Sequence, residues 1–93
     1  MGGVLDELFA TILERQAHPR ADSYTARLLS AGQDEVLKKV GEEAMEVILA
    51  AKGQGRERLT AEVADLVYHL LVLLAAYGLT LADVEAELAR RRR

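Results

Sequence analysis

The sequence predicts an all-α protein built around a helical hairpin. Apolar residues recur at intervals of three and four residues along five segments, as they do in helices that cover a core. None of these segments shows the strict alternation of apolar and polar residues that is typical of a half-buried strand. Only 4% of the residues are aromatic although 51% are hydrophobic, so leucine, valine and alanine must fill the core. We therefore expect residues 1–93 to form a single domain of about five helices.

The first two predicted helices occupy the N-terminal third of the chain. Residues 4–16 carry leucine, isoleucine and phenylalanine at helical spacing, and this pattern stops before the only proline. Residues 23–32 follow as a shorter helix, whose start either Ser23 or Thr25 can cap. Gly32 is a signal for the end of this second helix.

The next two predicted helices form the hairpin. Residues 33–52 begin with Asp34 as a candidate cap and end at Gly53. Residues 57–78 form a long fourth helix that ends at Gly78. The GQGR segment between them is so short that we expect the two helices to lie side by side and antiparallel.

A fifth helix is predicted at residues 79–92. Thr80 in front of it and Asp83 three residues later come close to a capping box, in which each side chain binds the backbone amide of the other residue. The arginines at 90–93 fall at the end of this helix, where the helix dipole stabilises cations. We interpret this basic run as a solvated helix terminus rather than as a nucleic-acid-binding tail.

Composition and charge argue against several classes of function and of binding site. The 12 basic and 15 acidic residues give a net charge of −3, which disfavours general nucleic-acid binding. The lack of cysteine excludes disulfides and thiolate zinc sites. No basic start followed by a long apolar run marks a signal peptide, and the most apolar stretch, 66–79, is short for a membrane span and contains His69. We expect a cytoplasmic protein without nucleic-acid or membrane partners.

The stretch KKVGEEAMEVILAAK crowds three carboxylates into about one helical turn. Glu42, Glu43 and Glu46 repel one another there, at a cost of about a few tenths of a kcal/mol for each pair. Successive residues of a helix are about 100° apart, so these glutamates and Lys39 border an apolar stripe. Glu43 lies at the edge of this stripe, where it could point into a groove between helices. The stripe consists of Val36, Val40, Ala44, Val47, Ile48 and Ala51.

The fourth predicted helix carries a second acidic pair. Glu62 and Asp65 are three residues apart on one face, and His69 follows one turn later. This helix is apolar all round, so we expect it to be largely buried, and buried acids are unfavourable unless they are paired, hydrogen-bonded or bound to a metal. If this pair faces Glu43 and Glu46 across the hairpin, four carboxylates converge. A cysteine-free set of oxygen ligands favours Mg²⁺ or Mn²⁺.

Simpler interpretations stand beside this hypothesis. An acidic run on a helix is most often a solvated face, and only the two acidic pairs together, in register across a hairpin, favour a metal site. A histidine such as His69 is more often a satisfied core or interface residue than a ligand, and the tyrosines are more often packing residues. The Glu-x-x-His spacing of di-iron bundles is absent, which disfavours redox iron. Lys38, Lys39 and Lys52 can pair with nearby glutamates or meet a polyphosphate.

Three strings resemble the phosphoribosyl-ATP pyrophosphohydrolases, a family within the MazG-like group of all-α nucleotide pyrophosphohydrolases. They are SYTARLL, KKVGEEAMEVILAAK and LTAEVADLVYHLLVLL, and the resemblance runs from about residue 23 to the C-terminus. EExxE followed by ExxD marks the wider group, whereas SYT, KVGEE and ADLVYHLLVLL point to this family. Met45 stands where a smaller residue is expected, which concerns the packing beside the motif rather than the ligands.

The resemblance implies an activity and a set of site residues. The activity is Mg²⁺-dependent hydrolysis of phosphoribosyl-ATP to phosphoribosyl-AMP and pyrophosphate, the second step of histidine biosynthesis, in a homodimer whose helices build a shared bundle; Mn²⁺ is a candidate substitute. The implied metal ligands are Glu43, Glu46, Glu62 and Asp65. The candidates for the base that takes a proton from water are Glu42 and Glu43. The candidates for added positive charge at the phosphates are Lys39, Lys52 and Arg56. The candidates for contact with the phosphoribosyl or adenine end are Ser23, Tyr24 and Arg27.

Two other functions compete with this one. The acidic motif is shared with pyrophosphohydrolases that act on ordinary or damaged nucleoside triphosphates, so the motif alone does not choose between substrates. The chain can also be a non-enzymatic dimerisation module, in which the acids are solvated and the apolar fourth helix forms the interface. Mg²⁺ and nucleotide should stabilise an enzyme against heat and leave such a module unchanged.

Overall fold

The computed structural model describes residues 3–92 and places them in five α-helices. The helices are α1 (Val4–Ala17), α2 (Tyr24–Ala31), α3 (Gln33–Gly53), α4 (Arg56–Ala76) and α5 (Leu81–Arg91). No strand occurs among these described residues, and the all-α prediction is confirmed. Each helix begins and ends within two residues of the bounds expected from the sequence.

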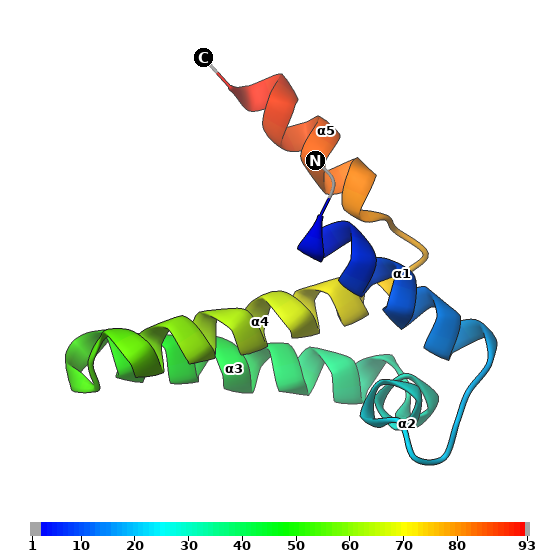
Figure 1. Cartoon of the computed structure of the whole chain (residues 1–93), viewed down its shortest axis with the longest axis horizontal. Coiled ribbons are helices and arrows are strands. Elements are labelled where there is room, and N and C mark those ends of the chain that lie inside the picture. The colour runs from blue at the N-terminus through cyan, green and yellow to red at the C-terminus, as the bar shows by residue number, and fades with distance from the viewer. Residues whose placement is uncertain (1–2, 93) are drawn as a thin grey trace.

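Helices α3 and α4 form the expected hairpin and make the most extensive contact in the fold (Figure 1). They run antiparallel on either side of a turn in which Gly55 adopts a φ of 91°, a conformation that residues with a side chain rarely adopt. At the other end of the hairpin, α2 crosses the beginning of α3 and α1 lies against α4 (Figure 1). Helix α5 extends away from the hairpin (Figure 1). The other helices therefore leave much of the middle of the hairpin uncovered.

Side-chain caps fix two of the helix starts. The Ser23 hydroxyl accepts a hydrogen bond from the Ala26 backbone N–H at 3.1 Å, so Ser23 rather than Thr25 caps α2. The Thr80 hydroxyl accepts from the Asp83 backbone N–H at 3.1 Å, and the Asp83 carboxylate accepts from the Thr80 backbone N–H at 2.9 Å. The capping box expected at the start of α5 is confirmed.

All five helices contribute to a core at the end of the hairpin away from its turn. The core consists of Phe9, Ile12, Leu28, Val36, Leu71, Val72, Ala75 and Leu81. Two glutamines close the end of α4 beside this core. The Gln16 side-chain amide donates to the backbone oxygen of Ala75 at 3.0 Å, and the Gln33 amide donates to that of Ala76 at 3.2 Å. These amides satisfy carbonyls that a helix terminus leaves without a partner in the helix.

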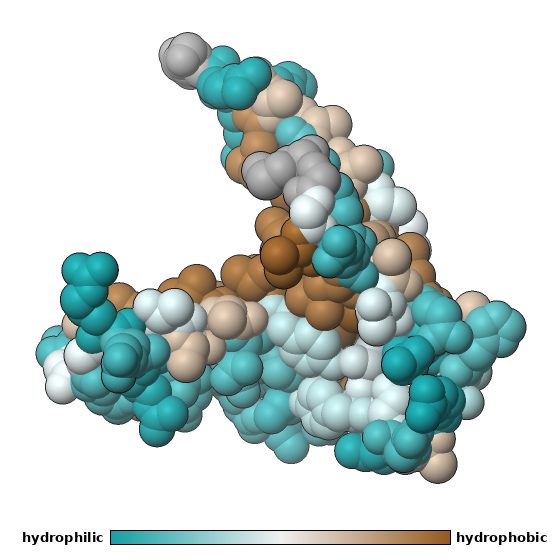
Figure 2. Space-filling model, in the orientation of Figure 1, coloured by the Kyte–Doolittle hydropathy of each residue, from teal (hydrophilic) through white to brown (hydrophobic). Residues whose placement is uncertain are grey.

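The half of the hairpin near its turn is poorly covered, so the expectation that α4 is largely buried is wrong for the single chain. Val63 on α4 is 41% exposed, and Ile48 in the apolar stripe of α3 is 53% exposed. Leu70, in the other half of α4, is 39% exposed as well. The cause is the length of the hairpin, since α1 and α2 reach only its other end. Figure 2 shows apolar surface where α1, α4 and α5 meet and along one edge of the hairpin.

Helix α4 is also long and apolar enough to cross a membrane, with a mean hydropathy of 1.7 in its most apolar window. This is a statement about length and composition alone, and the core helix of a soluble protein passes the same test. The buried face of α4 carries Glu62 and His69, both of which have polar partners within the fold. These contacts favour a core helix.

Candidate active site

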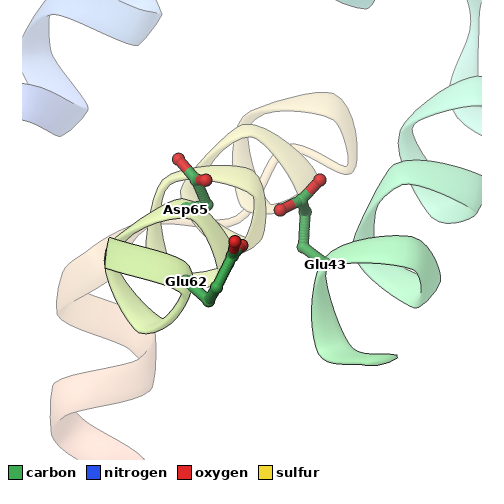
Figure 3. A group of neighbouring side chains, drawn as sticks. All are labelled: Glu43, Glu62 and Asp65. Carbon is green, nitrogen blue, oxygen red and sulfur yellow. The ribbon is translucent and has the colours of Figure 1, made fainter. Parts of the chain in front are cut away.

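Three carboxylates converge along the hairpin, from Glu43 on α3 and from Glu62 and Asp65 on α4 (Figure 3). One carboxylate oxygen from each residue lies within 4.8 Å of the other two. Residues three apart share a helix face, which brings Glu62 and Asp65 together, and the antiparallel packing of the hairpin brings Glu43 towards them. The structure thus gathers three of the four residues expected as metal ligands. We call them the acidic group.

The acidic group concentrates negative charge in a partly buried place. Glu62 is only 8% exposed, Glu43 is half-buried and Asp65 is exposed. Two cations approach it, since Arg58 Nη1 lies 3.6 Å from Glu62 Oε2 and Lys39 Nζ lies 3.8 Å from Glu43 Oε2. The Arg58 side chain is 61% exposed, so water screens much of its attraction for Glu62. A divalent cation would neutralise the remaining negative charge.

The acidic group suits Mg²⁺ in both chemistry and spacing. Mg²⁺ binds oxygen ligands at about 2.0–2.1 Å in an octahedron, so two ligands of one ion are about 3 Å apart when adjacent and about 4.2 Å apart when opposite. The carboxylate oxygens lie within 4.8 Å of one another, so the side chains can share an ion after moving closer together. Mg²⁺ also tends to keep several waters, and the exposed position of Asp65 leaves room for them.

Glu42 and Glu46 lie outside the acidic group. Both side chains are exposed, and Glu42 Oε1 pairs with Lys39 Nζ at 3.3 Å. The helix geometry explains the difference, because Glu43 is rotated by about 100° from Glu42 towards the apolar face of α3. The role of Glu46 as a metal ligand stays a prediction.

Lys39 connects the acidic group to a hollow between α2 and α3. This hollow has a volume of about 330 Å³. Its lining residues are Tyr24, Arg27, Leu28, Ala31, Glu35 and Lys39. The hydrogen bond to Glu42 is the main cause that raises the pKa of Lys39, which keeps the ammonium charged at neutral pH. Three of the expected substrate-binding residues, Lys39, Tyr24 and Arg27, therefore surround one hollow beside the acidic group.

The other expected substrate-binding residues have different surroundings. Ser23 uses its hydroxyl oxygen to cap α2. Lys52 and Arg56 are exposed at the turn of the hairpin, and Lys52 follows Glu43 by nine residues, which is roughly 14 Å along a helix axis. Within the part of the chain that the structure describes, neither Lys52 nor Arg56 forms an ion pair with Glu43, Glu62 or Asp65.

Comparison with known proteins assigns the chain to a family. The family model of phosphoribosyl-ATP pyrophosphohydrolase matches residues 5–92. The chain belongs to this family. Among the phosphoribosyl-ATP pyrophosphatases it resembles is that of Pelotomaculum thermopropionicum, 54% identical over 96% of this chain and 91% of the relative. That of Haloarcula marismortui is 53% identical over 98% of this chain and 95% of the relative.

A longer relative in the same pathway is also similar. A histidine biosynthesis bifunctional protein of Gloeobacter violaceus is 54% identical over 96% of this chain, and the chain matches 40% of that protein's length. The family expected from the SYT, KVGEE and ADLVYHLLVLL strings is confirmed.

Three contacts in this member of the phosphoribosyl-ATP pyrophosphohydrolase family were not anticipated from its sequence. Arg58 pairs with Glu62, and their spacing of four residues on one helix was an available signal. The Tyr24 hydroxyl lies 3.1 Å from His69 Nε2, a contact between residues 45 positions apart that no local pattern indicates. The hydroxyls of Thr25 and Tyr68 form a second hydrogen bond between the same two helices.

Proposed function

We propose that the chain hydrolyses phosphoribosyl-ATP to phosphoribosyl-AMP and pyrophosphate, the second step of histidine biosynthesis. One observation carries this proposal: the carboxylates of Glu43, Glu62 and Asp65 converge in a chain that matches the phosphoribosyl-ATP pyrophosphohydrolase family over residues 5–92. Cleavage between the α and β phosphates separates two anionic products. A site that gathers acidic ligands with nearby cations suits that chemistry.

Mg²⁺ is the cofactor that we propose for the acidic group, with Mn²⁺ as a substitute. Glu43, Glu62 and Asp65 would hold the ion, and Glu46 remains a candidate fourth ligand that would have to turn inwards. When bound, the ion supplies positive charge for the phosphates and acidifies a water. The protein's part is to hold the carboxylates on two packed helices, so that little reorganisation is needed when substrate arrives.

Glu43 is our preferred candidate for the base that takes the proton from the attacking water. Its side chain is 15% exposed and contributes one oxygen to the acidic group, which leaves a second oxygen for a water. Glu42 is 48% exposed and lies outside the acidic group, so it is less well placed. A base must lie within hydrogen-bond reach of the proton that it abstracts.

We propose that one phosphate group of the substrate meets Lys39 and Arg27 in the hollow between α2 and α3. Lys39 lies between this hollow and the acidic group, with its Nζ 3.8 Å from Glu43. Lys52 and Arg56 can contribute only where the substrate, or a second subunit, extends to the turn of the hairpin.

A homodimer is the assembly that we propose for this enzyme. The exposed apolar side chains on the hairpin and on α5 include Met45, Ile48, Leu49, Val63, Leu70 and Leu88. A hollow of about 270 Å³ between α1, α4 and α5 is lined entirely by leucine and valine. Exposed apolar surface of this kind is typical of protein–protein interfaces, and a second copy would cover it. We expect this dimer to act in the cytoplasm.

The decisive experiment follows pyrophosphate release from four substrates in parallel, with and without EDTA. The substrates are phosphoribosyl-ATP, ATP, dCTP and dUTP. We expect rapid, EDTA-sensitive cleavage of phosphoribosyl-ATP alone. Cleavage of the ordinary triphosphates instead would retain the metal site but contradict the substrate, and inactivity on all four would favour a non-enzymatic dimerisation module.

A further inference from the structure

His69 is a buried histidine on α4 with two directed polar contacts. It is 6% exposed. Its Nδ1 lies 2.8 Å from the backbone oxygen of Asp65, and its Nε2 lies 3.1 Å from the hydroxyl of Tyr24 on α2. The ring of Tyr68 packs edge-on against it, with the ring centroids 4.9 Å apart. The imidazole is thus held at both nitrogens and by an aromatic neighbour.

The chemistry of these partners determines which atom donates. The Asp65 carbonyl can only accept, so His69 Nδ1 carries a proton and donates it. In the neutral imidazole Nε2 is then an acceptor, and the Tyr24 hydroxyl donates to it. Burial is the main cause that raises the pKa of Tyr24, so the phenol keeps this proton at neutral pH. Tyr24, although 44% exposed, is therefore anchored by its hydroxyl.

The position of Tyr24 matters because this residue lines the hollow between α2 and α3. Lys39 and Arg27 line the same hollow, and the one acid on its wall forms an ion pair with a neighbouring lysine. An anion bound there would meet positive charge and would lie beside the acidic group, because Lys39 Nζ is 3.8 Å from Glu43. Phosphoribosyl-ATP has such an anion, the 5′-phosphate of its phosphoribosyl group, which is separate from the triphosphate that is cleaved.

We propose that His69 is a positioning residue that holds Tyr24 as one wall of a binding site for the phosphoribosyl phosphate. This inference rests on the proposed hydrolysis of phosphoribosyl-ATP. His69 acts through Tyr24 and touches no reacting atom. Loss of the His69–Tyr24 hydrogen bond therefore weakens substrate binding and leaves the bond-breaking step almost unchanged.

Three substitutions separate this role from a purely structural one. His69→Leu removes both hydrogen bonds but keeps an apolar side chain in a buried place, while the second hydroxyl pair still joins α2 to α4. His69→Gln retains a carbonyl oxygen that can accept from Tyr24. Tyr24→Phe removes the donor. His18→Gln and Tyr77→Phe are matched controls, because both side chains are exposed and neither lines the hollow.

Steady-state pyrophosphate release is measured over a range of phosphoribosyl-ATP and Mg²⁺ concentrations. We expect KM to rise about threefold to tenfold in His69→Leu and in Tyr24→Phe, the effect of losing one hydrogen bond. We expect kcat and the Mg²⁺ concentration for half-maximal activity to stay within about twofold of the wild-type values. The reason is that Tyr24 is proposed to contact neither the bond that is cleaved nor the Mg²⁺ ion. His69→Gln should restore most of the wild-type KM, and the double variant should be no weaker than either single variant because both break one interaction.

Two results would overturn the inference while the proposed function stands. An unchanged KM in His69→Leu would show that the hydrogen bond has no part in substrate binding. Parallel losses of kcat, Mg²⁺ response and melting temperature, without rescue by His69→Gln, would show that His69 only supports the fold. Wild-type protein that fails to cleave phosphoribosyl-ATP would instead overturn the proposed function, and this inference with it.

Discussion

Glu62 is the residue at which electrostatics and burial conflict most directly. It is 8% exposed and shares the acidic group with Glu43 and Asp65, while its counter-charge, Arg58, is an exposed side chain 3.6 Å away. Glutamine has nearly the same shape and no charge. We therefore expect Glu62→Gln to raise the melting temperature in EDTA by about 4 °C, as roughly 0.5–1 kcal/mol does in a domain of this size. The same substitution should abolish the stabilisation by Mg²⁺.

Thermal melts in EDTA and in Mg²⁺ test this prediction. Glu57→Gln is the matched control, because Glu57 is an exposed glutamate in the first turn of the same helix. It should gain as much melting temperature from Mg²⁺ as the wild type does, and in EDTA it should not melt higher than the wild type, because it loses a charge that the helix dipole stabilises. If Mg²⁺ raises the melting temperature of Glu62→Gln as much as that of the wild type, Glu62 is not a metal ligand.

Glu42 and Glu43 are neighbours in sequence with different surroundings, and their substitutions should differ accordingly. We expect Glu43→Gln to lower kcat by a factor of about 10² or more, because it removes both a proposed base and a ligand. We expect Glu42→Gln to lower kcat less than about tenfold, because it removes only the ion pair with Lys39. The measurement is kcat for phosphoribosyl-ATP at saturating Mg²⁺. A larger loss in Glu42→Gln would reverse the assignment of the base.

Among the elements, α4 depends on side chains from two other helices at its C-terminal end. Gln16 on α1 donates to the Ala75 carbonyl at 3.0 Å and Gln33 on α3 to the Ala76 carbonyl at 3.2 Å. We expect Gln16→Leu to destabilise the protein by about 1 kcal/mol, the typical net value of such a bond, and so to lower the melting temperature by about 4–8 °C. Gln54→Leu, at an exposed position after α3, should change it little. Equal melting of both variants would show that the contact contributes nothing.

The helices were predictable from the sequence because their end signals are local. Gly32 and Gly78, the Ser23 cap and the Thr80 capping box all act within a few residues, so the predicted bounds agree with the structure within two residues. The convergence of Glu43, Glu62 and Asp65 was also predictable, because a short turn fixes the orientation of the hairpin. The contact between Tyr24 and His69 was not, since it depends on how α2 crosses the hairpin.

Coverage of α4 was misjudged for a related reason. An all-apolar helix indicates that something covers it, but not whether the cover comes from the same chain. In this chain the helices available are too few to cover both halves of the hairpin, and Ile48 and Val63 stay exposed in the half near the turn. The need for burial was therefore indicated correctly, and the second subunit of the expected homodimer stays the proposed source of the cover.

For the whole molecule, this exposed apolar surface leads to a prediction about assembly. Leu70 lines the apolar hollow between α1, α4 and α5, so a charge placed there would be buried in the proposed dimer interface. We expect Leu70→Glu to run as a monomer in size-exclusion chromatography with light scattering, where the wild type runs as a dimer. Leu13→Glu is the control, because Leu13 is 40% exposed but does not line this hollow. A wild-type monomer, or an unaffected Leu70→Glu dimer, would contradict this interface.

The acidic group also lies between the two arms of the hairpin, with one carboxylate on α3 and two on α4 (Figure 3). An ion held there would link α3 to α4 partway along the hairpin. The ends of these helices near Gly55 have little other support. Opening of those ends would then be coupled to the concentration of free Mg²⁺, because a ligand that binds only the closed form suppresses local unfolding. Amide hydrogen exchange at residues 46–60 should slow when Mg²⁺ is added and should stay fast in Glu62→Gln. The enzyme would in this way stiffen only when the ion that its chemistry requires is present.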